Sequence, residues 1–404
     1  MKIEVCKWYG NADSPVLLWI DDLANAWVDV SGSGSIELGE DWGYAKHGEN
    51  SSFDYLEQKL LLRHPKIKTT FFVPVGKRSG VVSDSSIKVI SEAINSDEET
   101  KAFFRNIGEN PKFEMAYHGT THGIAREKME DFVQEWSTFE SLEEALETIE
   151  KGRSIFYEVF GFYPKGGKYC GYEPGKYGDE SIDRSGFFWW CRHSNVDLIE
   201  YGDSEHGGSD KNPLTSYDIK TFGKNGVIDI PTTIGGHMLN RYLNKDERII
   251  KGTVKRLLRR QLIEKEMRKI DYLIKNKLLI SIEEHISPAR NDGRRQLLNI
   301  FDDMEGLNEI FDYISGKNVW YCTGSELAEY YYCRENSVIE QSGDEFAVKF
   351  KPGNVELSSK FLSLKVEGGG VEKLILPNGK EVSKTNGVFN IEIMDGVYKT
   401  TELK

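Results

Sequence analysis

The stretch Val16-Leu17-Leu18-Trp19-Ile20-Asp21-Asp22 decides the fold class of this 404-residue chain. Its unbroken apolar run predicts a strand that is buried on both faces, as strands of parallel sheets are. Two carboxylates then stand at the carboxyl end of that strand, where α/β enzymes carry their chemistry. The alternative is that Asp21 and Asp22 only cap the next helix.

Comparable apolar runs recur along the chain, and helical patterns separate them. The runs cover residues 68–75, 227–231, 278–282 and 318–322. The third run is followed directly by Glu283-Glu284-His285, and an amphipathic stretch at residues 86–106 predicts a helix. The repeated β-α order predicts a barrel or a doubly wound sheet, in which the groups at successive strand ends gather at one rim.

Two histidines stand four residues apart in Tyr117-His118-Gly119-Thr120-Thr121-His122. Residues 112–116 before them alternate like a short strand. Imidazoles at this spacing can converge on one divalent ion, and a third, hard ligand usually completes the protein's share of an open catalytic site. The alternative is that His118 and His122 are unrelated surface residues in a Gly/Thr turn.

Composition narrows the class of partner and the compartment. The formal net charge of -13 argues against a nucleic-acid partner. The longest apolar runs, such as Val16–Ile20, are too short to cross a bilayer. Residues 1–7 contain no apolar signal core, which predicts a cytoplasmic protein. The five scattered cysteines contain no CxxC pair and predict buried free thiols.

The chain is longer than a domain with one hydrophobic core usually is. Its sequence pattern changes near residue 334. Short alternating runs follow, separated by turn sequences such as Pro352-Gly353-Asn354 and Pro377-Asn378-Gly379. This pattern predicts an antiparallel β module. We therefore expect a catalytic α/β domain at residues 1–333 and an accessory β module at residues 334–404.

Taken in order, these motifs resemble those of the polysaccharide deacetylases of carbohydrate esterase family four, which share the chitooligosaccharide deacetylase homology domain. The family's paired-Asp strand is Trp19-Ile20-Asp21-Asp22, and its His-Ser/Thr-x-x-His motif is His118 to His122. Thr69-Thr70-Phe71-Phe72-Val73 is similar to its Ala/Thr-Thr-Phe-Phe strand. Lys168-Tyr169-Cys170-Gly171 approximates the third motif, and Ile282-Glu283-Glu284-His285 the last. The likeness spans roughly residues 14–333.

The resemblance implies an α/β fold, namely a distorted (β/α)7-type barrel, to which the small C-terminal all-β module is added. It implies that Asp22, His118 and His122 bind a divalent metal, with zinc as the first choice. It also implies that Asp21 is the general base and His285 the general acid of an amide hydrolysis.

Several positions depart from the family pattern. Leu23 and Gly119 stand where the family has Gly and Ser or Thr, and Lys168 replaces an Arg whose forked geometry would orient a carboxylate. Tyr169 and Cys170 replace the usual prolines of the third motif. The fourth motif has no clean match, with Asp183 and Asp229 as weak candidates. These departures leave the metal ligands in place and the substrate class open.

Residues near the third motif are candidates for binding a sugar. Tyr169, Tyr172 and Trp190 offer flat apolar faces to a pyranose ring, and Lys168 belongs to the same substrate-binding set. The alternative is that the aromatic residues are ordinary core residues.

From these features we expect a metal-dependent hydrolase that removes an acetyl group from an N-acetylated sugar or oligosaccharide. Two alternatives stay open. One is an allantoinase-like hydrolase of a non-sugar amide on the same fold, and the other is a carbohydrate-binding relic without turnover. Metal content and acetate release distinguish the three. The sugar, the native metal and the oligomeric state are not specified by the sequence.

Overall fold

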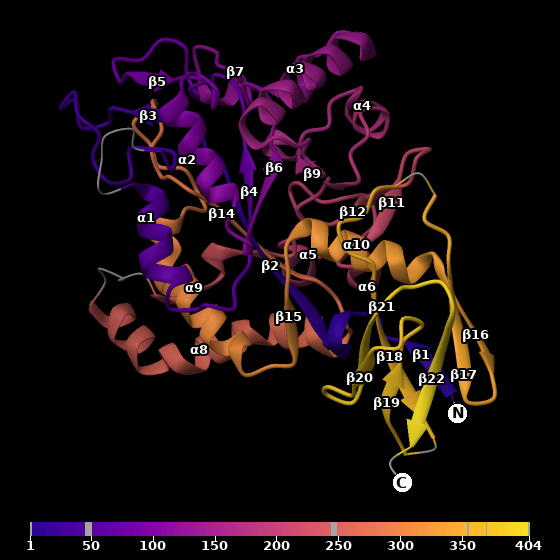
Figure 1. Cartoon of the computed structure of the whole chain (residues 1–404). Helices are drawn as coiled ribbons and strands as arrows, with labels where there is room; N and C mark the ends of the chain where they lie inside the picture. Colours follow the sequence, from indigo (N-terminus) through magenta and orange to yellow (C-terminus); the bar gives the residue numbers. More distant parts are fainter. Residues whose placement is uncertain (1, 45–50, 244–248, 354, 369, 403–404) are drawn as a thin grey trace.

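In the computed structural model, which describes residues 2–44, 51–243, 249–353, 355–368 and 370–402, a curled parallel sheet forms the centre of the protein (Figure 1). Its strands are β2 (Ser14–Asp21), β4 (Thr69–Val73), β6 (Phe113–Tyr117), β9 (Gly166–Lys168), β10 (Trp189–Cys191), β12 (Val227–Asp229), β13 (Ile234–Gly235) and β14 (Ile280–His285). They lie in the order β12-β10-β9-β6-β4-β2-β14-β13, and all neighbours run parallel. An antiparallel strand β11 (Lys220–Phe222) borders β12, and β15 (Val319–Tyr321) pairs with the start of β2.

One segment joins the two edges of this sheet. Its first half, β12, pairs with β10, and its second half, β13, pairs with β14. Between them, Ile230 N donates to Trp190 O at 3.0 Å and Thr233 N donates to Ser281 O at 3.1 Å. Residues 227–235 therefore occupy a single position in the sheet and pair with the strands at both of its edges. The described strands thus close into a distorted barrel. The expected (β/α)7-type barrel is confirmed.

Alternate residues of β2 face two different layers, as period-two strand geometry requires. Trp19 lies inside the barrel, with its ring against Phe72 and Trp189. Leu18 and Ile20 belong to the outer layer between sheet and helices. Every residue of β2 is buried, so the expected two-faced strand is confirmed.

The helices cover the outside of the barrel (Figure 1). The longer ones are α1 (Ser52–Leu56), continued by a π-helical turn η2 (Glu57–Leu61), α2 (Glu98–Gly108), α3 (Leu142–Phe160), α4 (Gly178–Arg184), α8 (Ile249–Lys275), α9 (Ile300–Ser315) and α10 (Gly324–Glu335). Short helices are α5 (Leu198–Tyr201), α6 (Pro213–Ser216) and α7 (Asn240–Leu243). Thr323 and Glu326 form a capping box at the start of α10.

The predicted helix at residues 86–106 is wrong in its first half. There β5 (Val89–Ser91) pairs antiparallel with β3 (Ala26–Val28), and α2 begins only after its cap, Asp97. Tertiary pairing therefore overrides the local helical pattern. A second small ribbon joins β7 (Gly123–Ile124) to β8 (Val133–Gln134).

The C-terminal module consists of two antiparallel sheets. Its strands are β16 (Ser337–Ser342), β17 (Glu345–Phe350), β18 (Phe361–Glu367), β19 (Val371–Ile375), β20 (Glu381–Ser383), β21 (Phe389–Glu392) and β22 (Val397–Glu402). The sheet orders are β16-β17-β22-β19-β20 and β1-β18-β21, where β1 (Lys2–Val5) comes from the other end of the chain (Figure 1). The module is thus all-β as expected, but it includes the N-terminal strand, which the division at residue 334 assigned to the barrel domain.

The sequence predicted buried free cysteines and no membrane-spanning segment. All five cysteines are free and buried, as expected. Among the described helices, none has the length and apolar character that a membrane crossing requires.

Candidate active site

A cavity of about 540 Å³ opens at the carboxyl ends of the barrel strands. Asp21 ends β2 and His285 ends β14, and the two are direct partners in the parallel register. Both line the cavity, together with His118, His122, Tyr172 and Glu283. The strand ends that the sequence singled out therefore meet at one rim.

Backbone geometry brings Asp22 to the two histidines. Asp22 and His122 both have left-handed backbone conformations, with φ of 68° and 69°. Such angles are uncommon outside Gly and cluster at functional sites. Asp22 Oδ1 consequently lies 3.4 Å from His122 Nε2 and 4.0 Å from His118 Nε2. The structure thus brings together the three residues that the sequence analysis grouped.

Both histidines are neutral at this site. Nδ1 of His118 lies 3.0 Å from the Lys168 carbonyl, which can only accept, so Nδ1 carries the proton and Nε2 keeps a free lone pair. Burial lowers the pKa of His118 and lowers that of His122 well below its ordinary value. The contacts to Asp22 are therefore not salt bridges, and the imidazoles have the protonation state of metal ligands.

Glu135 holds the backbone of the histidine turn in place. Its carboxylate accepts hydrogen bonds from the backbone N–H groups of Thr120, Thr121 and His122 at 2.7–2.9 Å. Gly119 precedes them with φ of 79°, and a Cβ there would lie 2.7 Å from Glu135 Oε2. The turn therefore requires glycine where the resembled family carries Ser or Thr.

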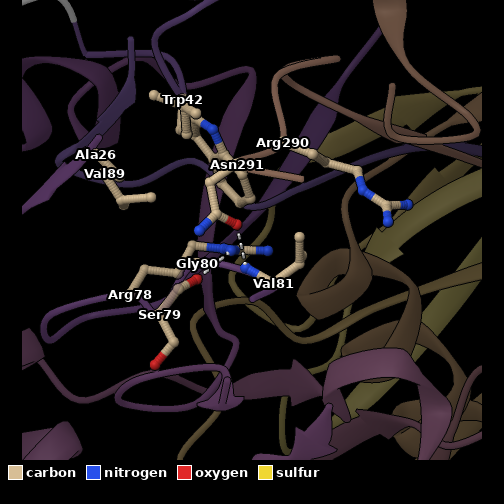
Figure 2. Close-up of a pocket in the computed structure, with 10 residues that line it drawn as sticks. Ala26, Trp42, Arg78, Ser79, Gly80, Val81, Val89, Arg290 and Asn291 are labelled. Atoms are coloured by element: carbon tan, nitrogen blue, oxygen red, sulfur yellow. Dashed lines mark hydrogen bonds between the residues drawn. The ribbon is translucent and has the colours of Figure 1, made fainter. Parts of the chain in front are cut away.

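Arg78 forms a bidentate ion pair with the Asp22 carboxylate. Its Nε donates to Oδ1 at 3.1 Å and its Nη2 donates to Oδ2 at 2.9 Å. The guanidinium lies 3.4 Å from the centre of the Trp42 ring, and Nη1 donates to the Ser79 carbonyl (Figure 2). Burial alone would raise the pKa of Asp22, but the Arg78 guanidinium holds it far below its ordinary value.

The room around Arg78 is small. The cavity beside it, lined by Trp42, Val81 and Asn291 among others, has a volume of only about 10 Å³, space for about one water at most (Figure 2). Asn291 Oδ1 accepts from the backbone N–H of Val81 at 2.8 Å and closes this wall. The guanidinium is therefore locked in its position on Asp22.

Lys168 holds Asp21 from the opposite side. Its Nζ donates to Asp21 Oδ2 and, at 2.6 Å, to Glu283 Oε1, and all three side chains are buried. Burial raises the pKa of Asp21, against the lowering effect of the Lys168 ammonium. Burial would also raise the pKa of Glu283, but Lys168 lowers it below its ordinary value. Asp21 Oδ1 has no hydrogen-bond partner among the described residues.

His285 is oriented by the segment before α9. Its Nδ1 lies 2.9 Å from the Leu298 carbonyl and so donates, and the Gln296 side-chain amide lies 3.3 Å from its Nε2. The Nδ1 contact leaves Nε2 on the side of Gln296, which also lines the cavity.

Three of the four residues assigned to substrate binding do not line the cavity. Tyr169 and Trp190 are completely buried, and their rings pack on each other 5.3 Å apart and on Trp136, so neither can present a face to a sugar. Lys168 is also buried, with its ammonium engaged by two carboxylates. Tyr172 does line the cavity, with its ring stacked on His206 at 5.7 Å.

The weak candidates for the fourth motif have structural partners. Asp183 accepts hydrogen bonds from the backbone N–H groups of Lys224 and Asn225 and so closes a loop. Asp229 pairs with Arg192 at 3.5 Å.

The donor set around Asp22 fits a divalent cation. It offers two neutral imidazoles and one ionised carboxylate, the ligand types of open zinc sites. His118 Nδ1–H donates to a backbone carbonyl, as the ring nitrogen not bound to the metal usually does in metal-binding histidines. Binding itself stays a prediction.

The chain is similar to solved polysaccharide deacetylases. A Mycobacterium smegmatis protein provisionally described as one shares 13% identity over 80% of this chain and 92% of its own, with a TM-score of 0.47. A Pseudomonas aeruginosa protein, also provisionally described as one, shares 14% over 82% and 95%, with a TM-score of 0.46. Puue allantoinase shares 14% over 80% and 92%, with a TM-score of 0.44.

No family model matches this sequence, and a search of curated proteins finds no match. The solved structures have low identities and TM-scores. The fold and the site of this protein therefore follow from its own topology and side chains.

Four residues of the site escaped the sequence analysis: Arg78, Glu135, Cys170 and Glu283. Glu283 carried a signal, because it lies two residues before His285 on a strand and so faces the same side. Cys170 was visible only as a departure from the third motif. Arg78 and Glu135 carried none, since their partners stand 56 and up to 15 residues away in the chain.

Proposed function

We propose that this protein is a metal-dependent hydrolase that removes an acetyl group from an N-acetylated sugar or oligosaccharide. The observation that carries the proposal is the meeting of Asp22, His118 and His122 beside a cavity that Asp21 and His285 also line. A cation site flanked by one carboxylate and one imidazole has the parts that amide hydrolysis requires.

A divalent cation, when bound, would lower the pKa of a water molecule and polarise the acyl carbonyl. Asp21 takes a proton from the attacking water as its oxygen bonds to the acyl carbon. Lys168 keeps the carboxylate oriented through Oδ2 while Oδ1 faces no other partner among the described residues. The Lys168 ammonium favours the ionised form of Asp21, against burial, which raises its pKa.

His285 supplies the second proton. Once protonated at Nε2, it donates to the departing nitrogen as the carbon–nitrogen bond breaks, giving acetate and a free amine. Its Nδ1–H stays bonded to the Leu298 carbonyl and keeps the ring in place. Tyr172 and His206 form a flat wall of the cavity, which suits the apolar face of a pyranose.

The test is acetate release from N-acetylglucosamine oligomers by the purified protein. We expect activity with about one zinc per chain, loss of activity with a chelator, and recovery when zinc is added. Asp21→Asn should lower turnover by about 10²–10⁴-fold while leaving metal content unchanged. Full turnover in this variant would refute the base assignment. Absence of acetate release from metal-loaded protein would refute the proposed function and favour a binding relic.

One observation favours a second candidate, a hydrolase of a non-sugar amide that works without an ion. Arg78 already neutralises Asp22 through both carboxylate oxygens. Allantoin is the probe for this candidate. Its hydrolysis by metal-free protein, unaffected by chelator, would support the second candidate against the first.

A further inference from the structure

Cys170 lies at the same centre as the two histidines. One ligand atom from each of Cys170, His118 and His122 lies within 4.8 Å of the other two. All three residues are buried, Cys170 completely. The buried Nδ1 of His122 has no hydrogen-bond partner among the described residues. A buried imidazole nitrogen without a protein partner is available to a ligand or a water molecule.

Local packing keeps the thiol at this position. Cys170 Sγ lies 3.3 Å from the His118 carbonyl, to which it donates a weak hydrogen bond. A Cβ at residue 119 would approach Sγ to 3.2 Å, closer than ordinary contact. Gly119 and Cys170, two departures from the resembled family's motifs, therefore share one space. The missing side chain at one makes room for the thiol of the other.

The Asp22 carboxylate is not fully available to a cation. Both of its oxygens accept hydrogen bonds from Arg78, so a cation that approaches Asp22 also meets the guanidinium charge. That repulsion weakens Asp22 as a ligand in a buried site, where charges are poorly screened. A second anionic donor beside the two histidines would compensate.

We propose that Cys170 binds the metal as a thiolate together with His118 and His122, and that Asp22 provides a weaker contact that water can displace. This inference rests on the metal centre of the proposed function. On binding, a sulfur–metal bond forms and the thiol proton is released to solvent. A soft thiolate donor selects zinc or cobalt over magnesium and manganese, which prefer oxygen ligands. Three firm protein ligands leave the open position that hydrolysis requires.

The test is the absorption spectrum of the protein loaded with one equivalent of cobalt(II). We expect an intense near-ultraviolet band from thiolate-to-cobalt charge transfer. Cys170→Ser should lose the band, and Cys170→Ala serves as a second variant should the first fail to fold. Cys191→Ser is the matched control, because Cys191 is an equally buried thiol outside the cluster, and it should retain the band. Asp22→Asn should also retain it.

The outcomes separate this inference from the proposed function. Wild-type protein that binds cobalt without the band overturns the role of Cys170, and so does a band that survives in both Cys170 variants. Acetate release without the band would leave the hydrolase standing and remove the thiolate ligand. A band that depends on Cys170, without acetate release from any N-acetylated saccharide, would keep the ligand and remove the hydrolase.

Discussion

Arg78 binds both carboxylate oxygens of Asp22, at 3.1 Å and 2.9 Å, and both side chains are buried. The Trp42 ring covers one face of the guanidinium (Figure 2). A fixed positive charge thus stands directly behind a candidate metal ligand. In the absence of a cation the carboxylate is already neutralised, and a bound cation has to share it.

We expect Arg78→Met to lower the free energy of unfolding of the metal-free protein by about 3–5 kcal/mol, because it leaves a buried carboxylate unpaired. Zinc should then stabilise this variant more than the wild type, since the ion supplies the missing charge. Urea unfolding with and without zinc measures both effects, and Arg78→Lys is the control that keeps the charge. Equal stabilisation by zinc in Arg78→Met and wild type would show that Asp22 does not contact the ion.

Removal of the Lys168 charge should change the pH dependence of catalysis. The active form of Asp21 is ionised, and an adjacent cation favours ionisation. Lys168→Met therefore raises the pKa of Asp21 and shifts the acidic limb of kcat/KM upward by about 1–3 pH units. Lys168→Arg keeps the charge and should leave the limb near its wild-type position. An unshifted limb in Lys168→Met would exclude Asp21 as the titrating base.

Glu135→Gln should loosen the histidine turn. The carboxylate accepts from three successive backbone N–H groups, and hydrogen bonds to a charged acceptor contribute about 1.5–3 kcal/mol each. We expect lower stability and a loss of zinc affinity of about 10–100-fold. Isothermal titration measures the affinity, with the exposed Glu143→Gln as the matched control. Unchanged affinity would mean that the turn holds its shape without the carboxylate.

Asp229 should make stability depend on pH in the acidic range. Burial raises its pKa to about 6, against the lowering effect of Arg192. Because the unfolded chain ionises first, the wild type loses stability as pH rises from about 4 to about 6, by up to about 3 kcal/mol. Asp229→Asn removes the titrating carboxyl. The free energy of unfolding of this variant, relative to that of the wild type, should therefore rise over the same pH interval. Urea unfolding at pH 4, 5, 6 and 7 tests this, and a constant difference would contradict it.

The charge of the cavity should select among substrates. Its lining includes carboxylates but, within the part of the chain that the structure describes, neither lysine nor arginine. The carboxylates are Asp21, Asp197, Glu205, Glu283, Asp302 and Asp303. Neutral or partly deacetylated, cationic saccharides should therefore react with kcat/KM at least about tenfold above phosphorylated ones at low salt. The double variant Asp197→Asn/Glu205→Gln should narrow that ratio, and a preference for phosphorylated sugars would contradict the expectation.

The barrel itself was predictable because its signals are local. Val16–Ile20 is apolar at every position, and such a run fits a strand covered on both sides, which β2 is. The strand-end positions of Asp21, His118 and His285 follow from the same runs. The prediction of a helix from residue 86 was wrong because residues 89–91 pair with residues 26–28. No local sequence pattern reveals this pairing.

The chemistry-bearing residue types and their order along the chain were determined by the sequence alone. The repeated β-α order makes the strands parallel and so places Asp21, His118 and His285 at one rim. Only the tertiary structure decided the surroundings of these residues. Arg78 reaches Asp22, Lys168 joins Asp21 to Glu283, and Cys170 contacts His118, each across 50 or more residues of chain. Periodicity encodes which face a side chain takes, whereas ion pairs and close packing depend on how distant segments meet.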